Sequence, residues 1–246
     1  MLNPKTISFW SAGGSTGKTS LAIAFALALR KHKTEVVLAD FKEVTPHVHK
    51  YFGIDLREKS DIYEAMENRQ EVIEVVKRHL YKKQGIWIFP GVGLEDFTKF
   101  EEKHFSAIIE VLKKEFDHVV IDTSPGIFFS STYASLKNSD LIYAVLLSNR
   151  WSLEDTAMMI DFICNRWNVR KNRFKALLNM AGHGEIDQHT VERILEIEAF
   201  SVRYGQKYII SDADRIVKAA FLDNDKAEGS SSPIRATERV KSLGAN

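Results

Sequence analysis

A glycine-rich loop follows the first apolar run of the chain, in the stretch SFWSAGGSTGKTS. It is close to the phosphate-binding pattern G-x-x-x-x-G-K-[ST], although Ala12 stands where the first glycine belongs. Glycines let backbone N–H groups turn inward around phosphate oxygens, Lys18 can reach the β- and γ-phosphates, and the Thr19 hydroxyl can ligate Mg²⁺. The alternative is a plain turn before a helix, but strand, glycines, G-K-T and alanine-rich helix occur together, which favours nucleotide binding. The predicted nucleotide-binding residues of the loop are Gly13, Gly14, Ser15, Thr16, Gly17, Lys18, Thr19 and Ser20.

Two further apolar runs end in an aspartate, Asp40 in VVLAD and Asp122 in HVVID. Ligands of open α/β sheets bind at the carboxyl ends of the strands, so both carboxylates are expected near the loop. Mg²⁺ and its water shell need negative oxygen ligands there. A single aspartate at a strand end is usually a turn former or helix cap, whereas two beside one phosphate-binding loop favour a metal-related role.

The elements that must position these residues alternate along the chain. Helices are expected in TSLAIAFALALRKH, in DIYEAMENRQEVIEVVKRHLY and over residues 104–116, where apolar residues share one face. Near-continuous apolar strands separated by helices predict an α/β fold, with a doubly wound, mostly parallel sheet and helices on both faces. At 246 residues without an internal repeat, one domain over residues 1–246 is expected. The predicted strands are KTISFW, TEVVLAD, GIWIFPG, DHVVIDTSPG, DLIYAVLLS, FKALLNM and QKYIIS.

Composition narrows the class of protein. Lys and Arg total 34 against 33 Asp and Glu, so no strong overall field favours nucleic acid or membrane. The one cysteine, Cys164, excludes an internal disulfide and a cysteine-ligated metal cluster within one chain. No apolar run reaches the ~18 residues of a membrane span, and the start shows no secretory leader, so a cytoplasmic protein without a transmembrane segment is expected.

Several motifs resemble the ParA/MinD family of P-loop ATPases, whose deviant-Walker branch includes partition, septum-placement and pilus-positioning proteins. IDTSPG is similar to its Walker B and switch II, LADFKEVTPHVHKYFGI to its switch I, and LLNM to a strand with an adenine-reading asparagine. SDADRIVKAAF is similar to a late segment beside the base, and SPIRATERVKSL to a final helix. The resemblance spans almost the whole chain in order.

The resemblance implies ATP and Mg²⁺ as cofactors. Thr19 would bind the metal directly, while Asp40 and Asp122 would bind it through water and, with Lys18, form the catalytic set. Gly126 would sense the γ-phosphate. Asn179 would hydrogen-bond adenine, with a role as a strand-end turn residue as the alternative.

Two departures from the family pattern stand beside this expectation. Members usually carry a second lysine that reaches across a dimer, and here Gly13 occupies that position. They also carry an acid that positions the attacking water, and here Lys42 replaces it. An ammonium has no acceptor lone pair, so binding should survive while hydrolysis and ATP-dependent homodimerisation should be weak. In extended backbone Lys42 would point with Asp40 toward the phosphates, the alternative being solvent or a pair with Glu43.

Three functions fit these observations. The first is a slow ATPase switch that positions intracellular cargo, with a protein partner from a partition, cell-pole, pilus or secretion machine. The second is a catalytically weak, ATP-bound scaffold, and the third an ATP-dependent biosynthetic enzyme. Direct DNA binding would rest on the basic stretch NRWNVRKNRFK. That stretch precedes a predicted strand, hence opposite the nucleotide, and a solvated connection is favoured.

Overall fold

The computed structural model describes residues 5–55, 62–67, 72–92, 98–182 and 184–222. These residues contain an eight-stranded sheet in the order β3-β4-β2-β5-β1-β6-β7-β8, in which only β3 runs antiparallel to its neighbour. The prediction of a doubly wound, mostly parallel sheet is therefore confirmed. The strands are β1 Thr6–Trp10, β2 Val36–Phe41, β3 Tyr81–Lys83, β4 Ile86–Phe89, β5 His118–Thr123, β6 Leu141–Leu147, β7 Phe174–Ala181 and β8 Ala199–Arg203.

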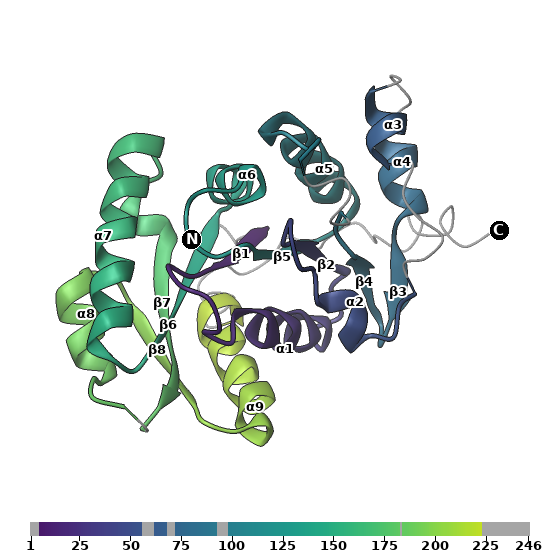
Figure 1. Ribbon diagram of the computed structural model, residues 1–246. Helices are drawn as coiled ribbons and strands as arrows, with labels where there is room; N and C mark the ends of the chain where they lie inside the picture. The colour runs from purple at the N-terminus through teal and green to yellow at the C-terminus, as the bar shows by residue number, and fades with distance from the viewer. Residues whose placement is uncertain (1–4, 56–61, 68–71, 93–97, 183, 223–246) are drawn as a thin grey trace, which may run out of the picture.

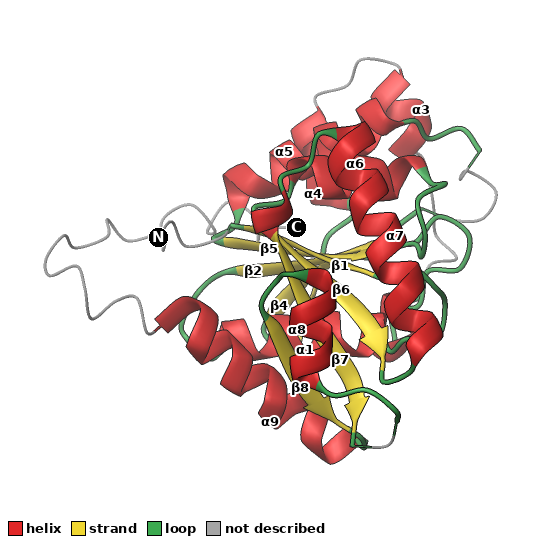
Figure 2. Ribbon diagram, turned by 90° about the vertical axis from the view of Figure 1, so that its left-hand side faces the viewer, coloured by secondary structure: helices red, strands yellow, loops and turns green. Residues whose placement is uncertain are grey.

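Helices cover both faces of the sheet. One face carries α1 (Lys18–Arg30), α2 (Val48–Tyr51) and α9 (Gln206–Val217), and these lie below the sheet in Figure 1. Helices α5 and α6 lie above it there, and Figure 2 shows the two layers from the side. The helices of this second face are α3 Ile62–Glu67, α4 Val72–Arg78, α5 Glu102–Glu115, α6 Ser130–Asn138, α7 Arg150–Trp167 and α8 Gln188–Leu195.

Strand β1 illustrates why the sheet needs both layers. All five residues of β1 are buried. Because successive side chains of a strand point to opposite faces, such a strand must be covered on both sides. Phe9 packs on the α1 side, where its ring lies 5.0 Å from that of Phe25. Trp10 packs on the α7 side. Phe25 also contacts Tyr143 of β6, with 5.1 Å between ring centroids, so α1 is fixed under the central strands and the loop before it is held in place.

Helix α9 corrects one prediction, because QKYIIS forms a helix and not a buried strand. Its buried residues Ala213, Ile216 and Val217 follow helical spacing and pack with α1. Gly205, at φ 112°, separates this helix from β8. The short apolar run YII fits a strand equally well in isolation, and packing against α1 determines the outcome.

The helical prediction for DIYEAMENRQEVIEVVKRHLY is confirmed in α3 and α4, while residues 61 and 68–71 lie outside the described residues. Its end is the second correction, because Tyr81 begins β3 instead of ending a helix. The predicted helix over residues 104–116 is confirmed as α5, with Phe105, Ile108 and Leu112 buried. The predicted final helix SPIRATERVKSL lies outside the described residues.

Candidate functional site

The glycine-rich loop connects β1 to α1 at the carboxyl end of the sheet. Gly17 precedes the helix with φ 83°, a conformation that L-residues rarely adopt. A Cβ atom at this position would also clash with Nδ2 of Asn179. The backbone conformation therefore favours glycine, and any other residue would also displace the Asn179 amide from its bond to the loop.

Asn179, near the end of β7, holds the loop from the other side. Its Nδ2 donates to the carbonyl oxygen of Thr16 at 2.8 Å, and its Oδ1 accepts from the backbone N–H of Met180 at 3.0 Å. The side chain is therefore placed against the loop, beside two surface hollows that Met180 and Ala181 help to line. Its proposed contact with adenine remains a prediction.

Sheet topology brings the two aspartates to the loop. Strand β5 lies between β1 and β2, with Asp122 paired in register with both Phe9 and Asp40. Both carboxylates are fully buried. The expectation that they meet near the loop is thus confirmed.

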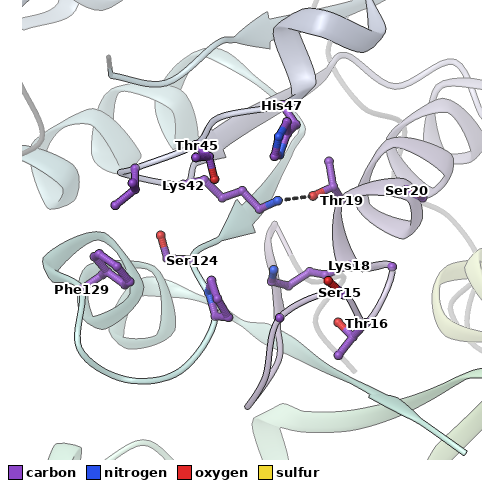
Figure 3. A pocket seen from close by; sticks show the side chains of 14 residues that line it. Ser15, Thr16, Lys18, Thr19, Ser20, Lys42, Thr45, His47, Ser124 and Phe129 are labelled. Carbon is purple, nitrogen blue, oxygen red and sulfur yellow. Dashed lines mark hydrogen bonds between the residues drawn. The ribbon is translucent and has the colours of Figure 1, made fainter. Parts of the chain in front are cut away.

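A pocket of about 600 Å³ lies at the carboxyl ends of these strands. Figure 3 shows the residues that line it. Its size is within the range of small-molecule sites. The lining residues are Gly14, Ser15, Thr16, Gly17, Lys18, Thr19, Ser20, Lys42, Val44, Thr45, His47, Ser124, Pro125 and Phe129. Most of the predicted loop residues therefore line one pocket.

Asp122 organises the polar centre of this site. The Thr19 hydroxyl donates to its Oδ2 at 2.7 Å, and Lys18 Nζ lies 3.9 Å from its Oδ1. Burial lowers the pKa of Lys18, while the Asp122 charge opposes that effect. Oδ1 of Asp122 has no hydrogen-bond partner among the described residues, although it is buried. A hydroxyl next to a carboxylate with an unused oxygen is a donor set that suits Mg²⁺.

Lys42 enters the same centre from the loop after β2. Its Nζ donates to Thr19 Oγ1 at 2.7 Å (Figure 3). The same atom lies 3.8 Å from Asp122 Oδ2. The side chain is 15% exposed. The prediction that Lys42 points into the site is confirmed, and the alternative of solvent or Glu43 is wrong. Glu43 instead accepts the backbone N–H of Ser131 at 2.6 Å.

Asp40 makes different contacts from Asp122. Its Oδ1 accepts the N–H of Lys42 at 3.1 Å, and its Oδ2 accepts those of His47 and Val48 at 2.7 and 2.9 Å. Burial and the neighbouring Asp122 raise the pKa of Asp40 to about 7, against the lowering effect of these N–H groups. Asp40 therefore shapes the loop of residues 42–48, and its metal role through water stays a prediction.

Gly126 lies in the turn after β5. With φ 74°, it donates its N–H to the Ser11 carbonyl at 2.9 Å, and its own carbonyl accepts from Trp10 Nε1 at 2.7 Å. These bonds tie the Ser124–Gly126 turn to the start of the glycine-rich loop. Its role as a γ-phosphate sensor stays a prediction.

Sequence reasoning missed six residues that line the pocket from the loops after β2 and β5. They follow Asp40 and Asp122 in the chain, so reading onward from these strand ends would have found them. Burial lowers the pKa of one of them, His47. The six are Val44, Thr45, His47, Ser124, Pro125 and Phe129.

Other site classes find less support. The basic stretch at residues 165–175 runs from the end of α7 to the start of β7, at the amino ends of the strands and thus opposite the pocket, as expected. Lys171 and Lys175 pair there with Glu196 and Glu198 at 2.8 and 2.7 Å. Within the described residues, no cluster of three or more His, Cys, Asp or Glu side chains suits a metal. No helix in the same part of the chain has both the length and the apolarity to cross a membrane.

Known proteins share this sequence pattern and fold. Septum site-determining protein MinD of Helicobacter pylori is 21% identical over 196 residues, covering 80% of this chain and 71% of that protein. The structure of MinD complexed with Mg-ADP from Pyrococcus horikoshii superposes with a TM-score of 0.72 at 17% identity, covering 88% of this chain and 97% of that one. A Borrelia burgdorferi plasmid partition protein bound to AMPPNP gives 0.70 at 18% identity, with coverages of 91% and 100%.

The family model for an AAA domain matches residues 4–176, which is most of the chain. The match includes the glycine-rich loop, both aspartates and Lys42. Together with the fold, these comparisons confirm the resemblance drawn from the sequence motifs. The chain belongs to this AAA domain family and is a ParA/MinD-like member of the P-loop ATPases.

Proposed function

We propose that this chain binds ATP with Mg²⁺ in the 600 Å³ pocket and acts as a slow ATPase switch. The observation that carries the proposal is that Lys18 and Thr19 both contact Asp122 at the carboxyl ends of the central strands. The loop would enclose the phosphates, Lys18 would meet the β- and γ-phosphates, and Thr19 would ligate the metal. Bound Mg²⁺ would neutralise charge that develops on the phosphates. Relatives with Mg-ADP and with AMPPNP support this assignment.

Slow hydrolysis follows from the side chains that reach the pocket. Lys42 occupies the position where the family pattern has an acid. Its Nζ donates to Thr19 Oγ1 and lies 3.8 Å from Asp122 Oδ2. An ammonium cannot accept a proton from water, so it cannot serve as a general base. The nearby carboxylate of Glu43 is held at Ser131 on α6 instead. The same observation favours a second candidate, an ATP-bound scaffold that turns over very little.

The biological role we propose is positioning of cargo inside the cell, by one ATPase domain over residues 1–246 in the cytoplasm. Relatives named for septum placement and plasmid partition support it. An ATP-dependent homodimer and a protein partner from such a machine would follow. Phosphate release measured with and without DNA, phospholipid vesicles or extract protein separates the switch, which is stimulated, from the scaffold, which is not.

Nucleotide binding itself is tested by Lys18→Ala. Removing a buried ammonium that meets phosphate should weaken ATP binding by ~2 kcal/mol or more, about thirtyfold. Calorimetric titration of wild type, Lys18→Ala and Lys31→Ala measures this. Lys31 is the matched control, because its exposed ammonium pairs with Asp214 far from the pocket. Equal affinity in all three proteins would disprove the assignment of the pocket.

A further inference from the structure

Three groups meet at a single point of the pocket: the Thr19 hydroxyl, the Asp122 carboxylate and the Lys42 ammonium. Thr19 Oγ1 donates to Asp122 Oδ2 at 2.7 Å and accepts from Lys42 Nζ at 2.7 Å. Lys42 Nζ also lies 3.8 Å from Asp122 Oδ2. The positive charge of Lys42 therefore lies beside the two groups best suited to bind Mg²⁺, the Thr19 hydroxyl and the Asp122 carboxylate.

An ammonium and Mg²⁺ cannot share these oxygens comfortably. Mg²⁺ binds oxygen at 2.0–2.1 Å, so two cations on the lone pairs of one hydroxyl would lie roughly 4 Å apart. Mg²⁺ also demands near-octahedral geometry, which a fixed ammonium inside the shell would obstruct. Like charges this close, in a site with little solvent, repel strongly.

The backbone around Lys42 is fixed, whereas its side chain has room to move. The Lys42 N–H donates to Asp40 and the Glu43 N–H donates to Ser124 Oγ at 3.2 Å, so both residues are tied to strand ends. Lysine carries its charge on a flexible four-carbon stem. The pocket that Lys42 lines extends over the glycine-rich loop. A rotation of the side chain alone can thus move the ammonium from Thr19 toward a bound phosphate.

We propose that the Lys42 ammonium and Mg²⁺ are alternative occupants of the Thr19–Asp122 oxygens, so that Lys42 makes nucleotide binding only weakly dependent on Mg²⁺. Lys42 supplies positive charge beside the phosphates when the metal is scarce, and the metal must displace it to bind. This inference rests on the proposed nucleotide binding. In this role, the Lys42 ammonium determines how strongly nucleotide binding depends on Mg²⁺.

The test compares ADP binding with and without Mg²⁺. ADP avoids hydrolysis and any contact with a γ-phosphate. The dissociation constant is measured by calorimetry in EDTA and in saturating Mg²⁺, and the ratio of the two values gives the coupling between metal and nucleotide. In wild type we expect a ratio below about tenfold. In Lys42→Met and Lys42→Gln it should rise at least ~tenfold further, because Mg²⁺ no longer competes with the Lys42 ammonium. Gln retains hydrogen bonding to Thr19 without the charge.

A second readout follows the metal directly. Mn²⁺ titrated into the protein–ADP complex and followed by electron paramagnetic resonance should bind at least about fivefold more tightly in both Lys42 variants than in wild type. Lys50→Met is the matched control, since Lys50 is an exposed lysine of α2 and does not line the pocket. Its ratio and its Mn²⁺ affinity should equal those of wild type.

The outcomes are distinct. An unchanged ratio and unchanged Mn²⁺ affinity in the Lys42 variants, with ADP still binding, would overturn the inference and leave the proposed function intact. A parallel loss of ADP affinity in both buffers would also overturn it, because it indicates a structural role for Lys42. Wild-type protein that binds no ADP in either buffer would refute the proposed function itself.

Discussion

Asp40 and Asp122 lie near the ends of neighbouring strands, where they pair in register, and both are fully buried. Their contacts nevertheless give them different roles. Asp122 faces side chains: it accepts from Thr19, lies near two lysines and has one unused buried oxygen. Asp40 faces backbone, and both of its oxygens accept N–H groups of the loop at residues 42–48. Two identical signals in the sequence thus separate into a site residue and a residue that builds the loop.

The largest effect should come from removing the loop-building aspartate. Asp40→Ala leaves three backbone N–H groups without their acceptor and should lower the free energy of unfolding by about 3 kcal/mol. Asp122→Asn preserves shape and should change it by about 1 kcal/mol or less, while weakening Mg²⁺-dependent nucleotide binding about tenfold. Urea unfolding at pH 7 and calorimetry measure the two effects. Equal losses of stability would contradict the separation of roles.

The pH dependence of stability sharpens the same comparison. Because the pKa of Asp40 is raised to about 7 in the folded protein, the native state binds more protons than the unfolded chain between about pH 4 and 7. The contribution of Asp40 to stability is therefore complete below this window and falls as the pH rises through it. Wild type should lose about 2.5 kcal/mol relative to Asp40→Ala between pH 5 and 8.

Unfolding curves of both proteins at each pH provide this difference, and the subtraction removes the titration of all other groups. A gap between the two proteins that widens toward pH 8 would show that the backbone N–H groups outweigh burial and the Asp122 charge. The Asp40 pKa would then be lowered instead of raised.

The third polar strand end, Asn179, extends the comparison to the base. Its amide combines a donor and an acceptor, a pair that matches the edge of adenine and mismatches that of guanine. We expect Asn179→Ala to reduce the preference for ATP over GTP by about 1 kcal/mol, roughly fivefold. Competition titrations with both nucleotides measure it. A variant that keeps the wild-type preference would limit the role of Asn179 to its bonds with the Thr16 carbonyl and the Met180 N–H.

Most of the fold could be predicted from the sequence because the patterns that indicate it are local. The glycine-rich loop, the aspartates at strand ends and the alternation of strands and helices depend on neighbouring residues. The segment QKYIIS was misread because its helix is selected by packing on α1. This packing brings together residues 183 positions apart, as in the Lys31–Asp214 pair at 3.4 Å. Tertiary contacts of this kind override short apolar patterns.

The candidate site shows the same limit. Chain position predicted that Lys42 would point toward the loop, but its contact with Thr19 depends on packing between β1, β2 and β5. The different bonds of Asp40 and Asp122 depend on how the chain turns after each strand. The pattern of residue types does not predict the conformation of those turns, since both aspartates follow a similar run of apolar residues.

The residues at positions 13 and 42 should limit turnover at the nucleotide site. Gly13→Lys combined with Lys42→Asp restores both a bridging cation and an acceptor for water, and a Cβ atom at position 13 would meet nothing within 4 Å. The direct measurement is steady-state phosphate release from Mg-ATP by wild type, this double variant and the double variant carrying Lys18→Ala. We expect slow release by wild type, at least ~tenfold faster release by the double variant, and loss of that gain without Lys18. Brisk release by wild type, with no gain in the double variant, would show that residues 13 and 42 do not limit turnover.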